Sequence, residues 1–170
     1  MISIKINGLD ELKKKIADKR DNFDRKGQIF LKRLAEVGLT VADAQFRTAQ
    51  YDGTNDVTVK VEVLSENRVA VVANGQTVAF IEFGTGITFT EQHPKADEMG
   101  AIRGSYGQGK GNNESWTYYG EAGTDGVVVR ESDNGTVVRT RGNPPARAMY
   151  QASQEMISKI TQIAKEVFTS

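Results

Sequence analysis

His93 is the only histidine of the chain, and it is the first residue to consider as a metal ligand or a catalytic base. Glu91 and Asp97 lie close to it in the sequence, so these three side chains could be considered as ligands of one metal ion. Zinc sites use three or four nitrogen, sulfur or oxygen ligands in fixed geometry, but the chain offers no second histidine and no cysteine. We therefore expect no metal or other cofactor, and a solvent-exposed histidine in a loop.

A second candidate is the glycine-rich run Gly104-Ser105-Tyr106-Gly107-Gln108-Gly109-Lys110-Gly111. It resembles the start of a phosphate-binding loop, which needs a preceding strand, a following helix and a Ser or Thr after the lysine. Gly111 stands where that hydroxyl belongs, and neither flanking element is indicated. The run is better explained as a flexible loop.

Other catalytic patterns are missing from the sequence. No nucleophile elbow, serine–histidine pairing or pair of carboxylates at a characteristic spacing stands out, so we expect a protein that is not an enzyme. Lysine plus arginine number 22, as do aspartate plus glutamate, and this balance disfavours a dedicated nucleic-acid regulator. No apolar stretch approaches the roughly 18 residues of a membrane span, so no membrane contact is expected.

The segment Phe80-Ile81-Glu82-Phe83-Gly84-Thr85-Gly86 is the remaining signal. Two glycines flank a small polar residue directly after an apolar run. One interpretation is a structural turn whose glycines take backbone angles that other residues avoid. The other is a cluster at a subunit contact, in which Glu82 accepts hydrogen bonds across the boundary and Thr85 satisfies a neighbouring backbone group.

The elements that must position these residues follow from periodicity. Met1–Ile6 alternates as a half-buried strand, and apolar residues from Leu9 to about Phe46 recur at helical spacing. Such a helix would be about 60 Å long, so we expect a kink or break between Asp21 and Gly27, where polar residues crowd. Asp52-Gly53 predicts a turn, and a hairpin pairs the alternating valines of residues 57–63 with Arg68–Ala73.

The secondary structure at the start of the second half stays open, since Gln76–Phe83 fits either a helix or a strand. Seven glycines and few apolar residues lie between Gly84 and Gly111, so we expect a long mobile loop over Gly84–Ser115. Trp116–Tyr119 predicts a strand, and Val127–Glu131 with Thr136–Arg139 a second hairpin.

The last element is an amphipathic helix. Pro144 and Pro145 are expected in its first turn, where proline is tolerated. Its apolar stripe, which we expect to face the core, is Met149, Ala152, Met156, Ile160, Ile163 and Val167. Replacement of Ile160 by Asp should then destabilise the fold. The whole predicts one domain over residues 1–170, of α+β class, with a mainly antiparallel twisted sheet and the two terminal helical regions packed on one face.

In this order the elements resemble the head–tail joining proteins of long-tailed double-stranded DNA bacteriophages, also called neck, tail-completion or minor structural proteins. Two motifs carry the resemblance: Glu82-Phe83-Gly84-Thr85-Gly86 and Thr140-Arg141-Gly142-Asn143-Pro144-Pro145-Ala146. A Trp-x-Tyr-Tyr strand at Trp116–Tyr119 lies between them. The chain departs from the commonest pattern of the family after the second motif, where Arg147 and Met149-Tyr150 stand in place of a Pro-Phe pair.

The resemblance implies a non-enzymatic virion protein that is assembled in the host cytoplasm. It would form a sixfold or twelvefold ring in the neck or tail. It would join head-completion or connector proteins to tail-tube or terminator proteins, and genomic DNA would pass through its lumen without sequence specificity. The flexible segment at about residues 84–115 and the hairpin at about 127–139 would be its arms. The subunit-interface candidates are Glu82, Phe83, Gly84, Thr85, Gly86, Trp116, Tyr118, Pro144, Pro145 and Arg147. One alternative is a tail terminator that caps the tail tube, and another is a soluble enzyme or ligand-binding protein with a glycine-rich lid.

Overall fold

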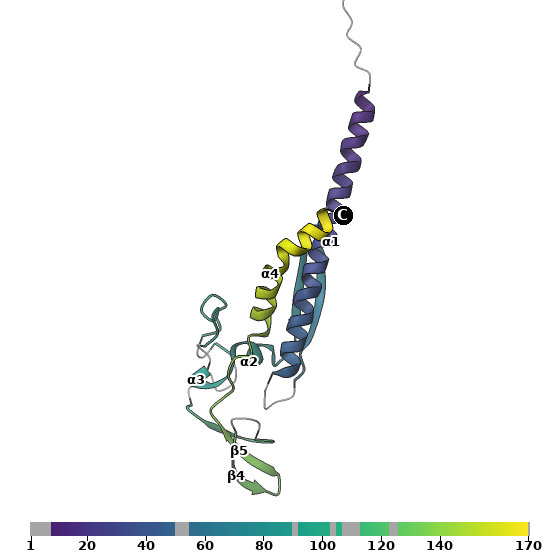
Figure 1. The fold of residues 1–170 in the computed structure, drawn as a ribbon. Coiled ribbons are helices and arrows are strands. Elements are labelled where there is room, and N and C mark those ends of the chain that lie inside the picture. Colours follow the sequence, from purple (N-terminus) through teal and green to yellow (C-terminus); the bar gives the residue numbers. More distant parts are fainter. Residues whose placement is uncertain are drawn as a thin grey trace, which may run out of the picture.

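The computed structural model describes residues 8–49, 55–89, 92–102, 105–106, 113–122 and 126–169. Two long helices, α1 (Leu9–Thr48) and α4 (Ala148–Phe168), lie side by side, and α1 continues alone well beyond the end of α4 (Figure 1). The short helices α2 (Val78–Phe83) and α3 (Gly86–Phe89) follow the first hairpin. The expected strand over Met1–Ile6 and the turn at Asp52-Gly53 lie outside the described residues.

Two small antiparallel sheets take the place of the single sheet that the sequence suggested. Strands β1 (Thr58–Ser65) and β2 (Arg68–Asn74) form a hairpin that packs on α1. Strands β3 (Trp116–Tyr119), β4 (Val127–Ser132) and β5 (Gly135–Thr140) form the second sheet in the order β3-β5-β4. The α+β class is confirmed, as are the two predicted hairpins, while Gln76–Phe83 resolves into a turn and a helix.

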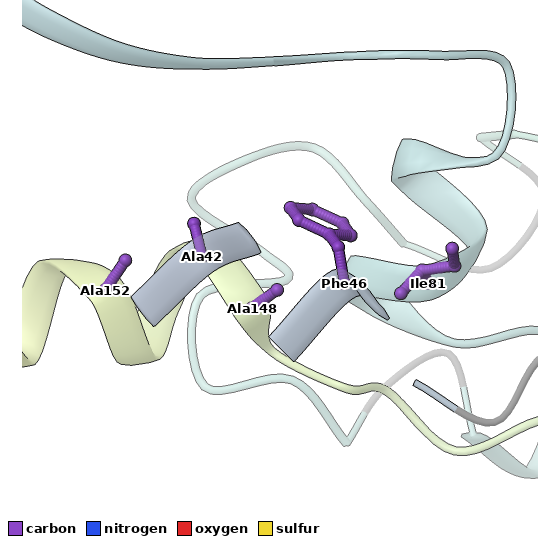
Figure 2. Close-up of a cluster of buried hydrophobic side chains, with 5 residues drawn as sticks. All are labelled: Ala42, Phe46, Ile81, Ala148 and Ala152. Carbon is purple, nitrogen blue, oxygen red and sulfur yellow. The ribbon is translucent and has the colours of Figure 1, made fainter. Parts of the chain in front are cut away.

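The core is built where α1, α2 and α4 meet. Figure 2 shows its five buried members, Ala42, Phe46, Ile81, Ala148 and Ala152. Three of the five are alanines, Ala42 from α1 and Ala148 and Ala152 from α4. Because these side chains are small, the backbones of the two helices approach closely beside the ring of Phe46. Gly38 extends this arrangement, because a Cβ atom there would lie 2.6 Å from the Met156 sulfur. Small residues on both helices therefore determine how closely α4 packs on α1.

The expected break of α1 between Asp21 and Gly27 is not present, since the helix runs unbroken for 40 residues. Tertiary contacts span the weak point. The ring of Phe168 lies 5.3 Å from that of Phe23 and 6.0 Å from that of Phe30, centroid to centroid, on either side of Gly27. The end of α4 thus supports the stretch that propensity alone would break.

The expected placement of the prolines in α4 is wrong. The helix begins at Ala148, three residues after Pro145. The chain before it is held against the end of α2, where the Ala146 amide donates to the Ile81 carbonyl oxygen at 2.8 Å and the Arg147 amide to that of Glu82 at 3.2 Å. The helix starts only after Arg147, because the left-handed backbone of that residue, with a φ of +58°, cannot belong to an α-helix.

The predicted core face of α4 is only partly right. Ala152, Ile163 and Val167 are buried, and Met156 contacts α1. Ile160, however, is 43% exposed, and Ile157 is 61% exposed. The inward face turns slightly away from the stripe drawn from the sequence, because α4 packs mainly on α1 and meets α2 only at its first turns. The expectation that Ile160 belongs to the core is therefore wrong.

Candidate functional site

The two motifs that the sequence singles out lie against each other in the fold. The Thr85 amide donates to the Asn143 carbonyl oxygen at 2.9 Å, and the Asn143 amide donates to the Thr85 hydroxyl oxygen at 2.8 Å. These residues are 58 positions apart in the sequence. We call the contact between residues 82–86 and 140–147 the motif junction.

Glycines make this junction possible. Gly86 and Gly142 have φ angles of +79° and +107°. A Cβ atom at Gly86 would lie 2.1 Å from the Arg141 carbonyl oxygen, and one at Gly142 would lie 2.1 Å from that of Thr85. Gly84 is similarly enclosed by the backbone of Asn143 and Pro145. The two chain segments therefore touch backbone to backbone, which no side chain would permit.

Glu82 is the centre of the junction and is only 4% exposed. Its carboxylate receives the first free amides of α4: the Met149 amide donates to Oε2 at 2.8 Å and the Tyr150 amide to Oε1 at 3.0 Å. Both the hydrogen bonds and the positive end of the helix dipole favour a negative charge here. A residue of α2 thus caps a helix that begins 66 residues later in the chain, as the positions of Glu82 and Ala148 show.

His93 completes this arrangement, and its expected exposure is wrong. The side chain is buried, with Nε2 lying 3.0 Å from Glu82 Oε1, while the Lys95 amide donates to Nδ1 at 3.0 Å. Since Nδ1 accepts, the proton of the neutral ring is on Nε2 and is donated to Glu82. The rings of Phe83 and Tyr150 lie 4.7 and 5.6 Å from the imidazole, centroid to centroid.

The segment expected to be a mobile loop is folded onto this junction where the structure describes it. Ala96 and Ala101 are buried, and the Ala101 amide donates to the Ala96 carbonyl oxygen at 2.9 Å. The Tyr106 hydroxyl donates to the Gly84 carbonyl oxygen at 2.6 Å, and burial raises the pKa of Tyr106 to about 12. A count of large apolar residues overlooks such contacts, because alanine, histidine and tyrosine supply the burial. Most of Gly104–Gly111 lies outside the described residues.

Arg147 occupies the strained position of the junction. It is the only described non-glycine residue with a positive φ, +58°, and it directly precedes α4. Its guanidinium Nη2 donates to the Gln92 carbonyl oxygen at 3.0 Å, which ties the 92–102 segment to the helix start. The Nε atom is buried without a hydrogen-bond partner among the described residues.

The other interface candidates fall into two groups. Phe83, Gly84, Thr85, Gly86 and Pro145 belong to the junction, and Pro144 beside them is exposed. Trp116 and Tyr118 lie apart from them on β3, where Trp116 is 37% exposed and the Tyr118 hydroxyl donates to the Glu121 carbonyl oxygen at 2.7 Å. Sequence reasoning missed His93, Tyr106 and Asn143 as members of the junction, since nothing near them in the sequence marks their distant partners.

The contacts of Glu82 and Thr85 are intramolecular, as the structural-turn interpretation expects. Both oxygens of Glu82 are occupied and buried, so the carboxylate is a helix cap rather than a group that reaches solvent. Over the described part of the chain, no three or more His, Cys, Asp or Glu side chains gather where they could hold a metal ion. Nor does any described helix have the length and apolar character needed to cross a membrane.

Exposed apolar side chains gather outside the junction. Consecutive valines of the edge strand β4, Val127, Val128 and Val129, are 55%, 49% and 53% exposed, and a bulge interrupts the pairing with β5 between Val128 and Arg130. Near the N-terminal end of α1, Leu12 and Ile16 are 54% and 60% exposed. Large contiguous apolar patches on a protein surface are often sites of contact with other molecules. No protein-family model, no curated protein and no solved structure matches the chain.

Proposed function

We propose that this chain is a non-enzymatic virion protein that forms a ring at the head–tail junction of a long-tailed bacteriophage, in the neck or at tail completion. In this role it joins head to tail and surrounds the passage for DNA. The resemblance of the two motifs supports the proposal, and so does their direct contact in the fold. Because the two motifs are hydrogen-bonded to each other, the motif junction would hold the arms of each subunit, at about residues 84–115 and 127–139, at fixed angles within a ring.

The observation that carries the proposal is the edge strand β4. Edge strands of soluble proteins are usually protected by charges, prolines or covering segments, because a bare apolar edge pairs with other chains. Here the first three residues of β4 are exposed valines, so this half of the edge is apolar on both faces, and Arg130 and Glu131 follow it. Pairing with a neighbouring copy would cover them. Contacts between unlike surfaces of identical copies close into rings when the rotation between copies allows it.

Native mass spectrometry and negative-stain electron microscopy of the purified chain, over a range of concentrations, test the ring directly. We expect sixfold or twelvefold rings for the natural chain and smaller species for Val129→Lys, which places a charge on the β4 edge. Val63→Lys is the matched control, because Val63 is a strand valine that is 72% exposed on the other sheet. A chain that stays monomeric or dimeric at every concentration, alone and with its tail and portal proteins, would overturn the proposal.

The position within the particle is tested separately. A phage that encodes the chain with Val129→Lys should accumulate filled heads and separate tails, since joining would fail after each part is complete. If tails of uncontrolled length accumulate instead, the alternative of a tail terminator that caps the tube is correct. Normal particle yield would contradict both. A monomer that converts or tightly binds a small molecule would favour the enzyme or ligand-binding alternative.

A further inference from the structure

The N-terminal half of α1 projects beyond the rest of the molecule (Figure 1), and its side chains over residues 9–25 are all exposed. We define the free half of α1 as residues 9–26. Leu9, Leu12, Ile16 and Phe23 recur there at helical spacing, with exposed fractions of 46%, 54%, 60% and 64%. They form one narrow apolar row, typical of a helix that packs against another helix.

This row continues the packing seam between α1 and α4. Phe23 contacts Phe168 near the C-terminal end of α4, and the row extends from there toward Leu9. Leu9 and Phe23 are separated by about 21 Å along the axis, at 1.5 Å per residue. The apolar face of α1 is therefore covered by α4 in the C-terminal half of α1 and exposed in the free half. Because a helix covers the first part of this face, another helix is the favoured occupant of the second part.

Charge is sorted around the free half. At about 100° per residue, the basic side chains on the half-circumference centred on the apolar row are Lys13, Lys19, Arg20 and Lys26, and Lys15 lies on its border. Asp24 alone among the acidic residues of this stretch reaches the border of that half. The opposite half holds Asp10, Glu11, Asp18 and Asp21, with Lys14 and Arg25. The apolar row is thus flanked by positive charge, while the acidic residues point away from it.

Several of these cations already contact carboxylates of α1 itself. Lys15 pairs with Glu11 at 2.8 Å, Lys13 with Asp10 at 3.9 Å and Arg20 with Asp21 at 3.4 Å. All of these side chains are at least 68% exposed, so the pairs are solvated and weak. They can exchange readily for carboxylates on a partner, where the neighbouring apolar surface is removed from water.

We infer that the free half of α1 binds an acidic amphipathic helix of another protein, laid along the apolar row in continuation of α4. The partner presents leucine-like side chains to Leu12 and Ile16, and carboxylates to the lysines and arginine on both sides. A second copy of this chain is a poorer fit, because two such rows would oppose lysine with lysine. This contact is distinct from the ring contact through β4, and it holds whether or not the chain forms a ring.

The probe is a synthetic helical peptide with leucine at the a and d positions of its heptads and glutamate at e and g. Its labelled form is titrated with the full chain by fluorescence anisotropy. We expect saturable binding that weakens as salt is raised, and none for a control peptide with lysine in place of glutamate. Equal binding of both peptides would overturn the inference, because the charge of the partner would then not matter.

Two charge reversals of equal size separate local from long-range effects. Lys13→Glu with Arg20→Glu reverses two charges beside the apolar row. Lys14→Glu with Arg25→Glu reverses two charges on the opposite half of the helix, so both pairs change the net charge by the same amount. We expect the first pair to weaken peptide binding at least about tenfold and the second less than about twofold. Equal weakening by both pairs would show that only net charge acts. Leu12→Gln with Ile16→Gln, at an unchanged melting temperature, should abolish binding.

Two further measurements decide between occupants. Phosphatidylserine-containing vesicles that bind the chain while the acidic peptide does not would replace the helix by a membrane surface. A native mass that falls for Lys13→Glu with Arg20→Glu, without peptide binding to the natural chain, would make a second copy the occupant. A ring that persists in this variant while peptide binding is lost supports the inference and leaves the proposed ring intact.

Discussion

Glu82 joins helix α2 to the start of α4, and three donors converge on its carboxylate. Replacing it with Ala leaves two amides and the His93 imidazole without an acceptor in a buried place. Loss of a cap and of charged hydrogen bonds should lower the free energy of unfolding by about 2–4 kcal/mol. Glu82→Gln should lose less, since one carbonyl oxygen can still accept. Urea denaturation measures both.

The control for this prediction is Glu66→Ala in the exposed turn between β1 and β2, where the change should stay within about 0.5 kcal/mol. Equal stability of Glu82→Ala and the natural chain would mean that the cap contributes nothing. Because the change acts on the fold, Glu82→Ala should also lower the melting temperature of the purified chain, whereas Glu66→Ala should not.

Gly86 allows a second residue-scale test. A methyl group there would meet the Arg141 carbonyl oxygen at 2.1 Å in addition to the strain of a φ of +79°. Gly100 has a similar φ of +66° but open space around its Cβ position. Gly100→Ala should therefore cost about 1 kcal/mol from backbone strain alone, and Gly86→Ala at least about twice that. Thermal unfolding of the two variants checks the difference, and equal losses would contradict the close approach.

At the scale of elements, α4 presents one face to α1 and another to solvent. Ile163 is 5% exposed and Ile160 is 43% exposed, although both are isoleucines of the same helix. Ile163→Asp should destabilise the fold by several kcal/mol, because an unpaired charge would be buried. Ile160→Asp should leave the melting temperature nearly unchanged. The reverse order would show that α4 is rotated relative to the structure.

The turn into α2 depends on Asp56. Its carboxylate accepts from the Thr77 hydroxyl at 2.6 Å and from the amides of Gln76 and Thr77 at 2.7 and 3.1 Å. The Thr77 hydroxyl bond and then the amide bonds lower the pKa of Asp56 below 3.8. Because the folded-state pKa is depressed, this stabilisation is present above the unfolded pKa and is lost as pH falls through the folded value. An NMR titration of the Asp56 carboxyl with a midpoint at or above 3.8 would contradict the turn.

At the scale of the whole molecule, stability should be uneven along α1. Residues 35–46 include the buried Ala35, Ala42 and Phe46, whereas residues 9–25 are all exposed, even though Phe23 contacts Phe168. A short helix without a packed face is marginal in water. Hydrogen exchange of the free chain should therefore be at least about tenfold faster at amides 13–22 than at amides 38–46. Equal protection would show that the free half is already covered in solution.

Local periodicity was sufficient for the long helices and the two hairpins, but not for α2, α3 or the start of α4. The valine alternation before and after Ser65 predicted the hairpin, and the helical spacing from Leu9 predicted α1, because both patterns depend on neighbours a few residues away. The sequence also marked Glu82–Gly86 and Thr140–Ala146 as motifs. The break that the sequence predicted in α1 is absent. Helix propensity reflects only local residues and takes no account of Phe168, which packs on Phe23 and Phe30 from the other end of the chain.

Only the tertiary structure decided what the motif residues do. Glu82 caps α4 through residues 67 and 68 positions away, and Thr85 meets Asn143 at a separation of 58. His93 is buried because Glu82, Phe83 and Tyr150 surround it, although its own neighbours in the sequence are mostly polar. Which face of α4 is inward depends likewise on how it packs against α1 and α2. Contacts over such separations arise from how elements pack, and no local pattern of residue types encodes them.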